Sequence, residues 1–312
     1  MMRLRDRAGR VRAGVAAVAV ATAVVVTASG CSGNTGPAVP GTLNVIASTD
    51  VWGAVASAVA GDKAGVRSIY TSPDGDPHEF EPTAQDTATI SGADVIVENG
   101  ADYDAYMDKA QKNPDTPVIS AFDAYKKANP NAPTGEGQVN EHFFYDFAVV
   151  KAVASDLANA MAEKDPPNRD AYRANAESFG RQIDELEGKA AQIKAAHSGV
   201  KVAQTEPLAA YLLAEAGLVD ATPSAFTDAV EAGNDPPAAA IATTEDLIGK
   251  KEVAALLYNV QAVDETTKRL LSVAGSNGLP VVKISETLPE GVSSYVAWQT
   301  TNVDAIASAV AK

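Results

Sequence analysis

Cysteine is almost absent from this sequence of 312 residues, in which Cys31 is the single example. One cysteine cannot form an internal disulfide or a thiolate metal site, so any bound metal would have nitrogen and oxygen ligands. Histidine is scarce as well, at three residues. The motifs H-E-x-x-H of zinc peptidases and G-x-S-x-G of serine hydrolases are both missing. The sequence therefore offers no nucleophile–base pair and no indication of an enzyme.

Basic residues are few relative to acidic ones: 25 Lys and Arg stand against 40 Asp and Glu, and the net charge is −15 at pH 7. Five of the arginines and one Asp lie within residues 1–30, so the chain without this segment carries −19. This balance argues against nucleic acid as a partner, because phosphates are bound by clusters of Lys and Arg. An acidic surface attracts cations, although an ordinary solvated acidic surface has the same composition.

The Ala- and Val-rich apolar run at residues 13–26 is 14 residues long, whereas a helix needs about 20 residues to cross a bilayer. An arginine-rich head before it and small residues after it predict an export signal over residues 1–30. The signal ends at A-S-G-C, which resembles the lipobox of bacterial lipoproteins, with Ala28 where Leu is usual. The resemblance implies that Cys31 is acylated and anchors the protein on the extracytoplasmic face of the cell membrane. Residues 31–42 would then be a flexible tether. The alternative is a secreted protein with an incidental cysteine.

Short apolar runs alternate with helical patterns along most of the remaining chain, which predicts parallel sheets covered by helices. We expect strands at 43–47, 66–70, 95–97, 117–120, 200–203, 252–258 and 281–284. We expect helices at 50–60, 83–91, 103–112, 144–164, 208–216, 265–276 and 292–310. The predicted fold class is therefore α/β.

Residues 168–197 differ from the rest, because they contain no proline and their apolar residues recur at helical spacing. A helix of this length spans about 45 Å. We therefore predict two α/β lobes, at 43–167 and 198–312, joined by a single long rigid helix at 168–197.

Two of the three histidines lie where ligands bind in such folds, on loops that follow strands. His78 stands in D-P-H-E-F-E-P-T at residues 76–83, and His142 stands in N-E-H at residues 140–142. The first motif closely resembles the D-P-H-x-[YF]-E-P-[ST] signature of the zinc/manganese-binding solute-binding lipoproteins of ABC transporters. The second resembles the looser second motif of that family, with Glu141 where Pro is usual.

The resemblance continues in order to the end of the chain. K-V-A-Q-T-E at residues 201–206 is similar to the third segment of the family, where manganese- and iron-type members carry the acid seen here at Glu206. Glu286 falls where the last ligand of the family, normally Asp, precedes the final helix. The resemblance implies that His78, His142, Glu206 and Glu286 hold one ion between the lobes. Asp264, which we expect to cap the helix at 265–276, is a reserve fourth ligand.

The implied function is capture of one divalent transition-metal ion and its delivery to the permease of an ABC importer by a monomer. Imidazole and carboxylate ligands suit Mn²⁺, Zn²⁺ and Fe²⁺ alike, and Zn²⁺ binds more tightly than Mn²⁺ in most sites. Residues 124–139 lack the His-rich loop that many members have at this point, which favours the manganese or mixed type. Two other classes stay open: a surface adhesin or scaffold lipoprotein, and an anchored metallohydrolase.

Overall fold

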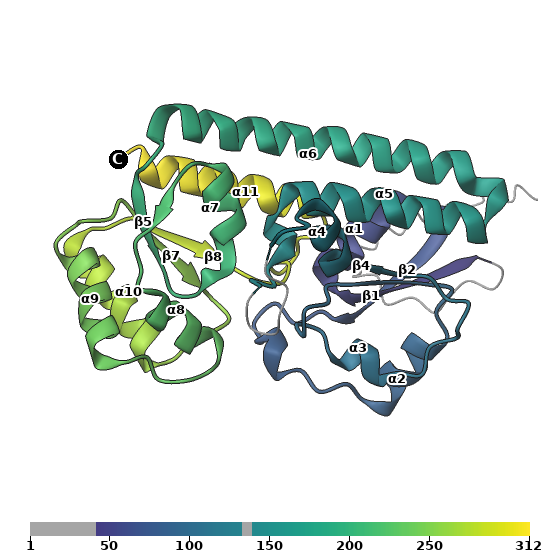
Figure 1. Cartoon of the computed structure of the whole chain (residues 1–312), viewed down its shortest axis with the longest axis horizontal. Helices are drawn as coiled ribbons and strands as arrows, with labels where there is room; N and C mark the ends of the chain where they lie inside the picture. Colours follow the sequence, from purple (N-terminus) through teal and green to yellow (C-terminus); the bar gives the residue numbers. More distant parts are fainter. Residues whose placement is uncertain (1–41, 133–138) are drawn as a thin grey trace, which may run out of the picture. The chain divides into compact units, whose positions relative to one another are not determined.

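Two parallel sheets, each of four strands, form the framework of the protein (Figure 1). The computed structural model describes residues 42–132 and 139–312, so the expected signal, tether and Cys31 anchor lie outside the described residues. The first sheet has the order β2-β1-β3-β4 and comprises β1 (Leu43–Thr49), β2 (Ala64–Tyr70), β3 (Val95–Glu98) and β4 (Val118–Ser120). The second has the order β6-β5-β7-β8 and comprises β5 (Lys201–Gln204), β6 (Val219–Asp220), β7 (Leu256–Asn259) and β8 (Val281–Ile284). All pairings between these strands are parallel.

Helices separate the strands in both halves, as the alternating pattern predicts. Those before the long helix are α1 (Asp50–Ala60), α2 (Ala84–Ser91), α3 (Tyr106–Lys109), α4 (Ala121–Ala128) and α5 (Phe147–Lys164). The long helix is α6 (Arg169–His197). Those after it are α7 (Ala210–Glu215), α8 (Ser224–Glu231), α9 (Ala238–Gly249), α10 (Glu265–Asn277) and α11 (Tyr295–Val310). Short 3₁₀ turns are η1 (Pro77–Glu79), η2 (Phe143–Tyr145), η3 (Pro166–Asn168) and η4 (Pro207–Ala209). The predicted fold class, two α/β lobes with one long helix, is confirmed.

The strands are stabilised because their alternate residues are buried on opposite faces of each sheet. In the first sheet, Val45 and Val95 belong to one core cluster while Ile46 and Ile96 belong to another. A face-by-face alternation of this kind requires helices on both sides of the sheet. Helix α6 contributes Ile183 and five other buried side chains to the larger cluster, which also includes residues of both sheets. One continuous core therefore runs through both halves of the described chain.

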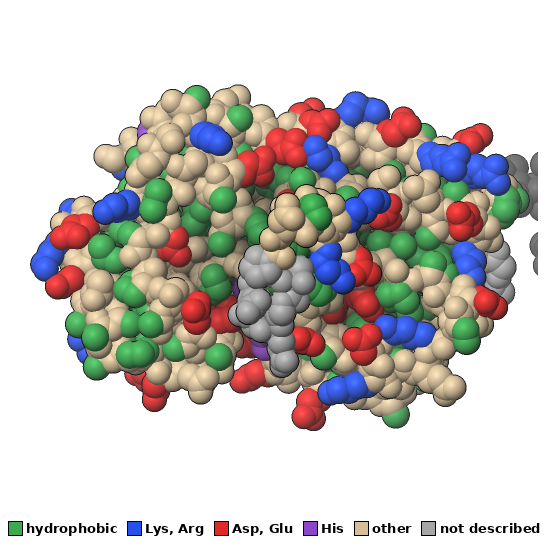
Figure 2. All heavy atoms as spheres, viewed as in Figure 1, with side chains coloured by type: hydrophobic (Ala, Val, Ile, Leu, Met, Phe, Trp, Pro, Cys, Tyr) green, Lys and Arg blue, Asp and Glu red, His purple; other side chains and the backbone are tan. Residues whose placement is uncertain are grey.

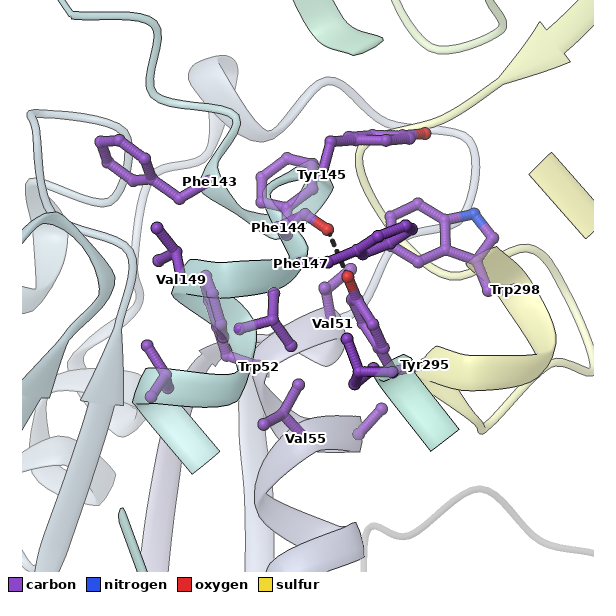
Figure 3. Packing of buried hydrophobic residues seen from close by; sticks show 14 of the residues in the cluster. Val51, Trp52, Val55, Phe143, Phe144, Tyr145, Phe147, Val149, Tyr295 and Trp298 are labelled. Carbon is purple, nitrogen blue, oxygen red and sulfur yellow. Dashed lines mark hydrogen bonds between the residues drawn. The ribbon is translucent and has the colours of Figure 1, made fainter. Parts of the chain in front are cut away.

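Aromatic side chains form the part of this core where the last helix meets the first half of the chain (Figure 3). The ring of Trp298 lies 6.3 Å from that of Phe144 and 5.3 Å from that of Tyr145, between ring centroids. The hydroxyl of Tyr295 donates to the backbone oxygen of Phe144 at 2.8 Å. Aromatic pairs at such separations contribute about 0.5–1.5 kcal/mol beyond their buried area. This packing holds the carboxyl-terminal helix against the segment that follows His142.

Several expected elements have different bounds in the structure. The expected strand at 252–258 begins only at Leu256, because Lys251 adopts a φ of 56° and turns the chain just before it. The expected helix at 103–112 is shortened to Tyr106–Lys109, following Ala101 and Asp102, which both have positive φ. Helix α4, at Ala121–Ala128, was not among the expected elements. The side chain of Ser120 caps α4 by accepting from the backbone of Asp123. Among the described residues, no helix is both long and apolar enough to cross a membrane.

Candidate metal centre

His78 lies on a short 3₁₀ turn that follows strand β2. The carboxylate of Asp76 accepts a hydrogen bond from the backbone of His78 at 2.8 Å, and Pro77 fixes the first position of the turn. These local bonds fix the backbone around His78, whose side chain is 28% exposed. The D-P-H portion of the motif therefore has a physical role: Asp76 is the cap, Pro77 makes the turn rigid, and His78 is the candidate ligand.

His142 is buried, with 1% exposure, immediately before the turn at Phe143–Tyr145. The side-chain oxygen of Asn140 accepts from the backbone of His142 at 2.9 Å and lies 2.8 Å from Nδ1 of the same residue. Because that oxygen can only accept, Nδ1 carries a proton, so Nε2 is the nitrogen whose lone pair a metal can take once any proton on it has left. Nε2 is buried and has no hydrogen-bond partner. Asn140 therefore sets the tautomer that a metal requires.

Glu286 follows strand β8 and is 1% exposed. The hydroxyl of Tyr103 donates to Oε2 of Glu286 at 3.1 Å, and the amide of Asn259 donates to Oε1 at 2.9 Å. The backbone amide of Glu286 donates to Oε1 of Gln261 at 2.6 Å. These donors hold the ionised carboxylate in one orientation although it is buried.

The three side chains converge on one point. Nε2 of His78 lies 3.5 Å from Oε2 of Glu286, and Nε2 of His142 lies 3.8 Å from the same oxygen. Ligand atoms of these three residues all lie within 4.8 Å of one another. A single ion with bonds of about 2.0–2.2 Å to each of them fits this spacing.

Glu206 lies beside this group and is linked to it through Asn259. It follows strand β5, is 4% exposed, and accepts a short hydrogen bond from the same Asn259 amide that donates to Glu286. Its carboxylate does not belong to the set of ligand atoms within 4.8 Å of one another. The structure thus brings three of the four predicted ligands together. The fourth, Glu206, is connected to them through the side-chain amide of Asn259. Asp264, the reserve ligand, instead caps α10 by accepting from Thr267 at 2.6 Å.

Glu231, at the end of helix α8, is a site residue that the sequence did not indicate. Its Oε1 lies 3.1 Å from Nε2 of His78 and 3.5 Å from Nε2 of His142. Together with His78 and Glu141 it forms a second set of ligand atoms within 4.8 Å of one another. No motif surrounds Glu231, and an acid at the end of a helix carries no signal of metal binding in one sequence.

The loop that carries His78 is bonded to the segment that carries Glu286. The amide of Gln261 donates to the backbone oxygen of Gly75 at 2.9 Å and to the hydroxyl of Thr287 at 2.7 Å. That hydroxyl in turn donates to the backbone oxygen of Ser72 at 2.9 Å. Direct hydrogen bonds therefore connect the segments that carry the candidate ligands His78 and Glu286, although these are far apart in sequence.

At this centre, carboxylates outnumber the histidines that can balance their charge. This imbalance shifts the pKa values of both kinds of side chain. Burial lowers the pKa of His78, but Glu231 and Glu286 outweigh it and raise that pKa to about 9. For His142, burial again opposes and the same two acids raise the pKa to about 10. Burial raises the pKa of Glu206, and the charges of Glu231 and Glu286 add to this effect. Burial also favours the neutral form of Glu286, but His142 and His78 outweigh it and lower its pKa. The group as a whole attracts positive charge. Figure 2 shows histidine surface beside acidic side chains.

Comparison with known proteins agrees with the family resemblance of the sequence motifs. The sequence profile of the family described as zinc-uptake complex component A, periplasmic (ZnuA), matches residues 45–309. The chain is 28% identical over 153 residues to the metal ABC transporter substrate-binding lipoprotein SloC of Streptococcus mutans, covering 46% of this chain and 49% of SloC. It is 27% identical over 168 residues to the manganese-binding lipoprotein MntA of Halalkalibacterium halodurans, covering 53% and 54% of the two chains. These matches span about half the length of the curated relatives.

Among solved structures, the substrate-binding protein FpvC of Pseudomonas aeruginosa in complex with Ni²⁺ has the same fold. The TM-score is 0.68 at 22% identity, and the superposition covers 86% of this chain and 97% of FpvC. Of the two curated relatives, SloC is thus a substrate-binding lipoprotein of a metal ABC transporter and MntA a manganese-binding lipoprotein. From the profile match over residues 45–309, the chain belongs to the ZnuA family, whose members are solute-binding proteins and not enzymes.

Proposed function

We propose that this protein is a lipid-anchored, extracytoplasmic solute-binding protein that captures one divalent transition-metal ion and delivers it to the permease of an ABC importer. The ion is cargo, either Mn²⁺ or Zn²⁺, with Fe²⁺ as a third candidate. His78 and His142 from the lobe at 43–167 bind it together with Glu286, and with Glu206 beside it, from the lobe at 198–312. Residues 168–197 link the lobes, and the protein acts as a monomer.

One observation carries this proposal: two imidazoles and a buried carboxylate converge from segments up to about 200 residues apart in sequence, with ligand atoms within 4.8 Å. Nε2 of His142 is buried with no hydrogen-bond partner, which is costly unless something binds it. Neutral imidazole and carboxylate together suit Mn²⁺, Fe²⁺ and Zn²⁺. The charge of the site favours a cation and disfavours an anionic solute.

The test is isothermal titration of the metal-stripped protein with Mn²⁺ and with Zn²⁺. We expect one ion to bind, and we expect His78→Ala to weaken binding by at least about 100-fold, because it removes a direct ligand. His197→Ala is the matched control, since His197 ends helix α6 and lies in neither cluster of candidate ligands. Equal affinities of the two variants would reject the site.

The anchor is tested separately, because Cys31 and the segment before it lie outside the described residues. We expect Cys31→Ser to move the protein from the membrane fraction to the soluble extracytoplasmic fraction and to abolish its labelling with a radioactive fatty acid. Unchanged membrane association would show that the cysteine does not carry the anchor. Metal binding by this variant should be unchanged.

A further inference from the structure

We infer that Glu231 is a direct ligand of the cargo ion and forms the solvent side of its site. This inference rests on the proposed function and adds to it a ligand outside the motifs. It also identifies helix α8, between strands β6 and β7, as part of the metal site.

The backbone of α8 fixes where Glu231 lies. The helix ends directly after this residue: the backbone of Asn234 donates to the oxygen of Ala229 at 2.8 Å, and that of Gly233 donates to the oxygen of Val230 at 2.9 Å. Gly233 has a φ of 65°, so the two bonds and the left-handed residue form a Schellman ending. Phe226 on the same helix is fully buried. Glu231 is therefore held on a terminated and anchored turn.

An acidic residue at this position needs a compensating positive charge. The carboxyl end of a helix carries partial negative charge, and an acid there costs about 0.3–1 kcal/mol. No Lys or Arg forms an ion pair with Glu231 among the described residues; its ion-pair contacts there are with His78 and His142. The side chain thus gains nothing as a helix cap, and its only electrostatic complement is the metal site.

Two buried atoms at the centre have no hydrogen-bond partner: Oε1 of Glu231 and Nε2 of His142. They lie 3.5 Å apart, and Oε1 is also 3.1 Å from Nε2 of His78. When the imidazoles are neutral, Nε2 of His142 and Oε1 of Glu231 face each other as two acceptors, and a buried polar atom left without a partner costs about 1–3 kcal/mol. A cation bound between them satisfies both at once, whereas Glu206 already accepts from Asn259.

Exposure divides the site into an inner and an outer side. The side chains of His142 and Glu286 are 1% and 2% exposed, whereas those of Glu231 and His78 are 16% and 28% exposed. An ion that arrives from solvent therefore meets Glu231 and His78 before it reaches His142 and Glu286. A further carboxylate strengthens binding of any divalent cation and favours Mn²⁺ relative to Zn²⁺, because Mn²⁺ prefers oxygen ligands.

The experiment compares Glu231→Gln with Asp228→Asn in the full-length chain, stripped of metal and titrated with Mn²⁺ and Zn²⁺ against a chromophoric chelator. Both substitutions remove one negative charge from helix α8, but Asp228 is exposed. We expect Glu231→Gln to weaken Mn²⁺ binding by about 10–100-fold and Zn²⁺ binding by less, and Asp228→Asn to change either by less than about twofold. Circular dichroism and thermal unfolding without metal check that the variants fold.

Two further measurements separate the possible outcomes. His78→Ala is titrated in parallel: if it abolishes binding while Glu231→Gln behaves like Asp228→Asn, the inference about Glu231 is wrong and the proposed function stands. If the unaltered protein binds neither ion, both fail. A crystal structure of the Zn²⁺ complex should place an oxygen of Glu231 about 2.0–2.2 Å from the ion. An ion more than about 3 Å from that carboxylate would overturn direct ligation even if the affinity had fallen.

Discussion

Replacement of Asn259 should destabilise the metal-free protein. It ends strand β7, is fully buried, and its amide donates to the carboxylates of both Glu206 and Glu286. Its side-chain oxygen accepts from the backbone of Gln261 at 3.0 Å. One neutral side chain therefore satisfies two buried acids and one buried amide.

The cost of Asn259→Leu follows from these bonds. A hydrogen bond to a charged group contributes about 1.5–3 kcal/mol, and an orphaned buried amide costs about 1–3 kcal/mol. Burial raises the pKa of Glu206, so this carboxylate carries less negative charge. Its hydrogen bond with Asn259 therefore contributes less to stability. We therefore expect the free energy of unfolding to fall by about 3–5 kcal/mol. Leucine has the same number and branching of side-chain heavy atoms as asparagine, so the change removes polar contacts without opening a cavity.

The assay is urea unfolding of the metal-stripped protein at pH 7. Asn277→Leu is the control, because the amide of Asn277 donates only to the backbone oxygen of Val273 near the end of α10. We expect this variant to lie within about 0.5 kcal/mol of the unaltered protein. Saturating Mn²⁺ should shrink the deficit of Asn259→Leu, since the ion neutralises the same carboxylates. A loss below about 1 kcal/mol without metal would refute the role assigned to Asn259.

Three further outcomes follow from buried groups. Burial raises the pKa of Asp50 to about 7, above its ordinary 3.8, so the folded state binds the proton of this carboxyl more tightly than the unfolded state does. The free energy of unfolding therefore falls as pH rises from about 4 to 7. Asp50→Asn should remove that decline and stabilise the protein by about 2–4 kcal/mol at pH 8 in urea unfolding; an unchanged pH profile would contradict this. Because the pKa values of His78 and His142 are raised to about 9 and 10, binding of Mn²⁺ at pH 7 should release up to two protons and weaken as pH falls. Calorimetry in buffers of different ionisation enthalpy measures this, and release of no protons would rule it out. Ile183→Ala, at a fully buried position of α6, should cost about 2–4 kcal/mol, whereas Gln182→Ala on the exposed face should cost less than about 0.5 kcal/mol.

The sequence predicted the strands that are buried on both faces, because such strands are short continuous apolar runs. It also predicted α6 within one residue of its start, at Arg169, since no proline interrupts its pattern. The expected elements do not include β6, an exposed strand of two residues, or the helices α4, α8 and α9. Strand β6 and the eight-residue helices α4 and α8 are too short for a periodic pattern to distinguish them from turns. Positive-φ residues such as Ala101 and Lys251, which moved the bounds of neighbouring elements, leave no sign in composition.

The sequence alone determined which local segments carry candidate ligands: D-P-H-E-F-E-P-T around His78, the Asn140 and His142 pair, and the end of β8 at Glu286. For His78 and His142, the side chain of a residue two positions earlier helps to orient the ligand residue, whereas the carboxylate of Glu286 is held by Tyr103 and Asn259, which are distant in sequence. Only the tertiary structure decided which further acid lies near the histidines. Glu206 is turned to Asn259, and Glu231 reaches His78 from a helix about 150 residues away in sequence. That choice depends on how α8 packs against its sheet and on where the loops of the two halves meet, and no local pattern encodes either.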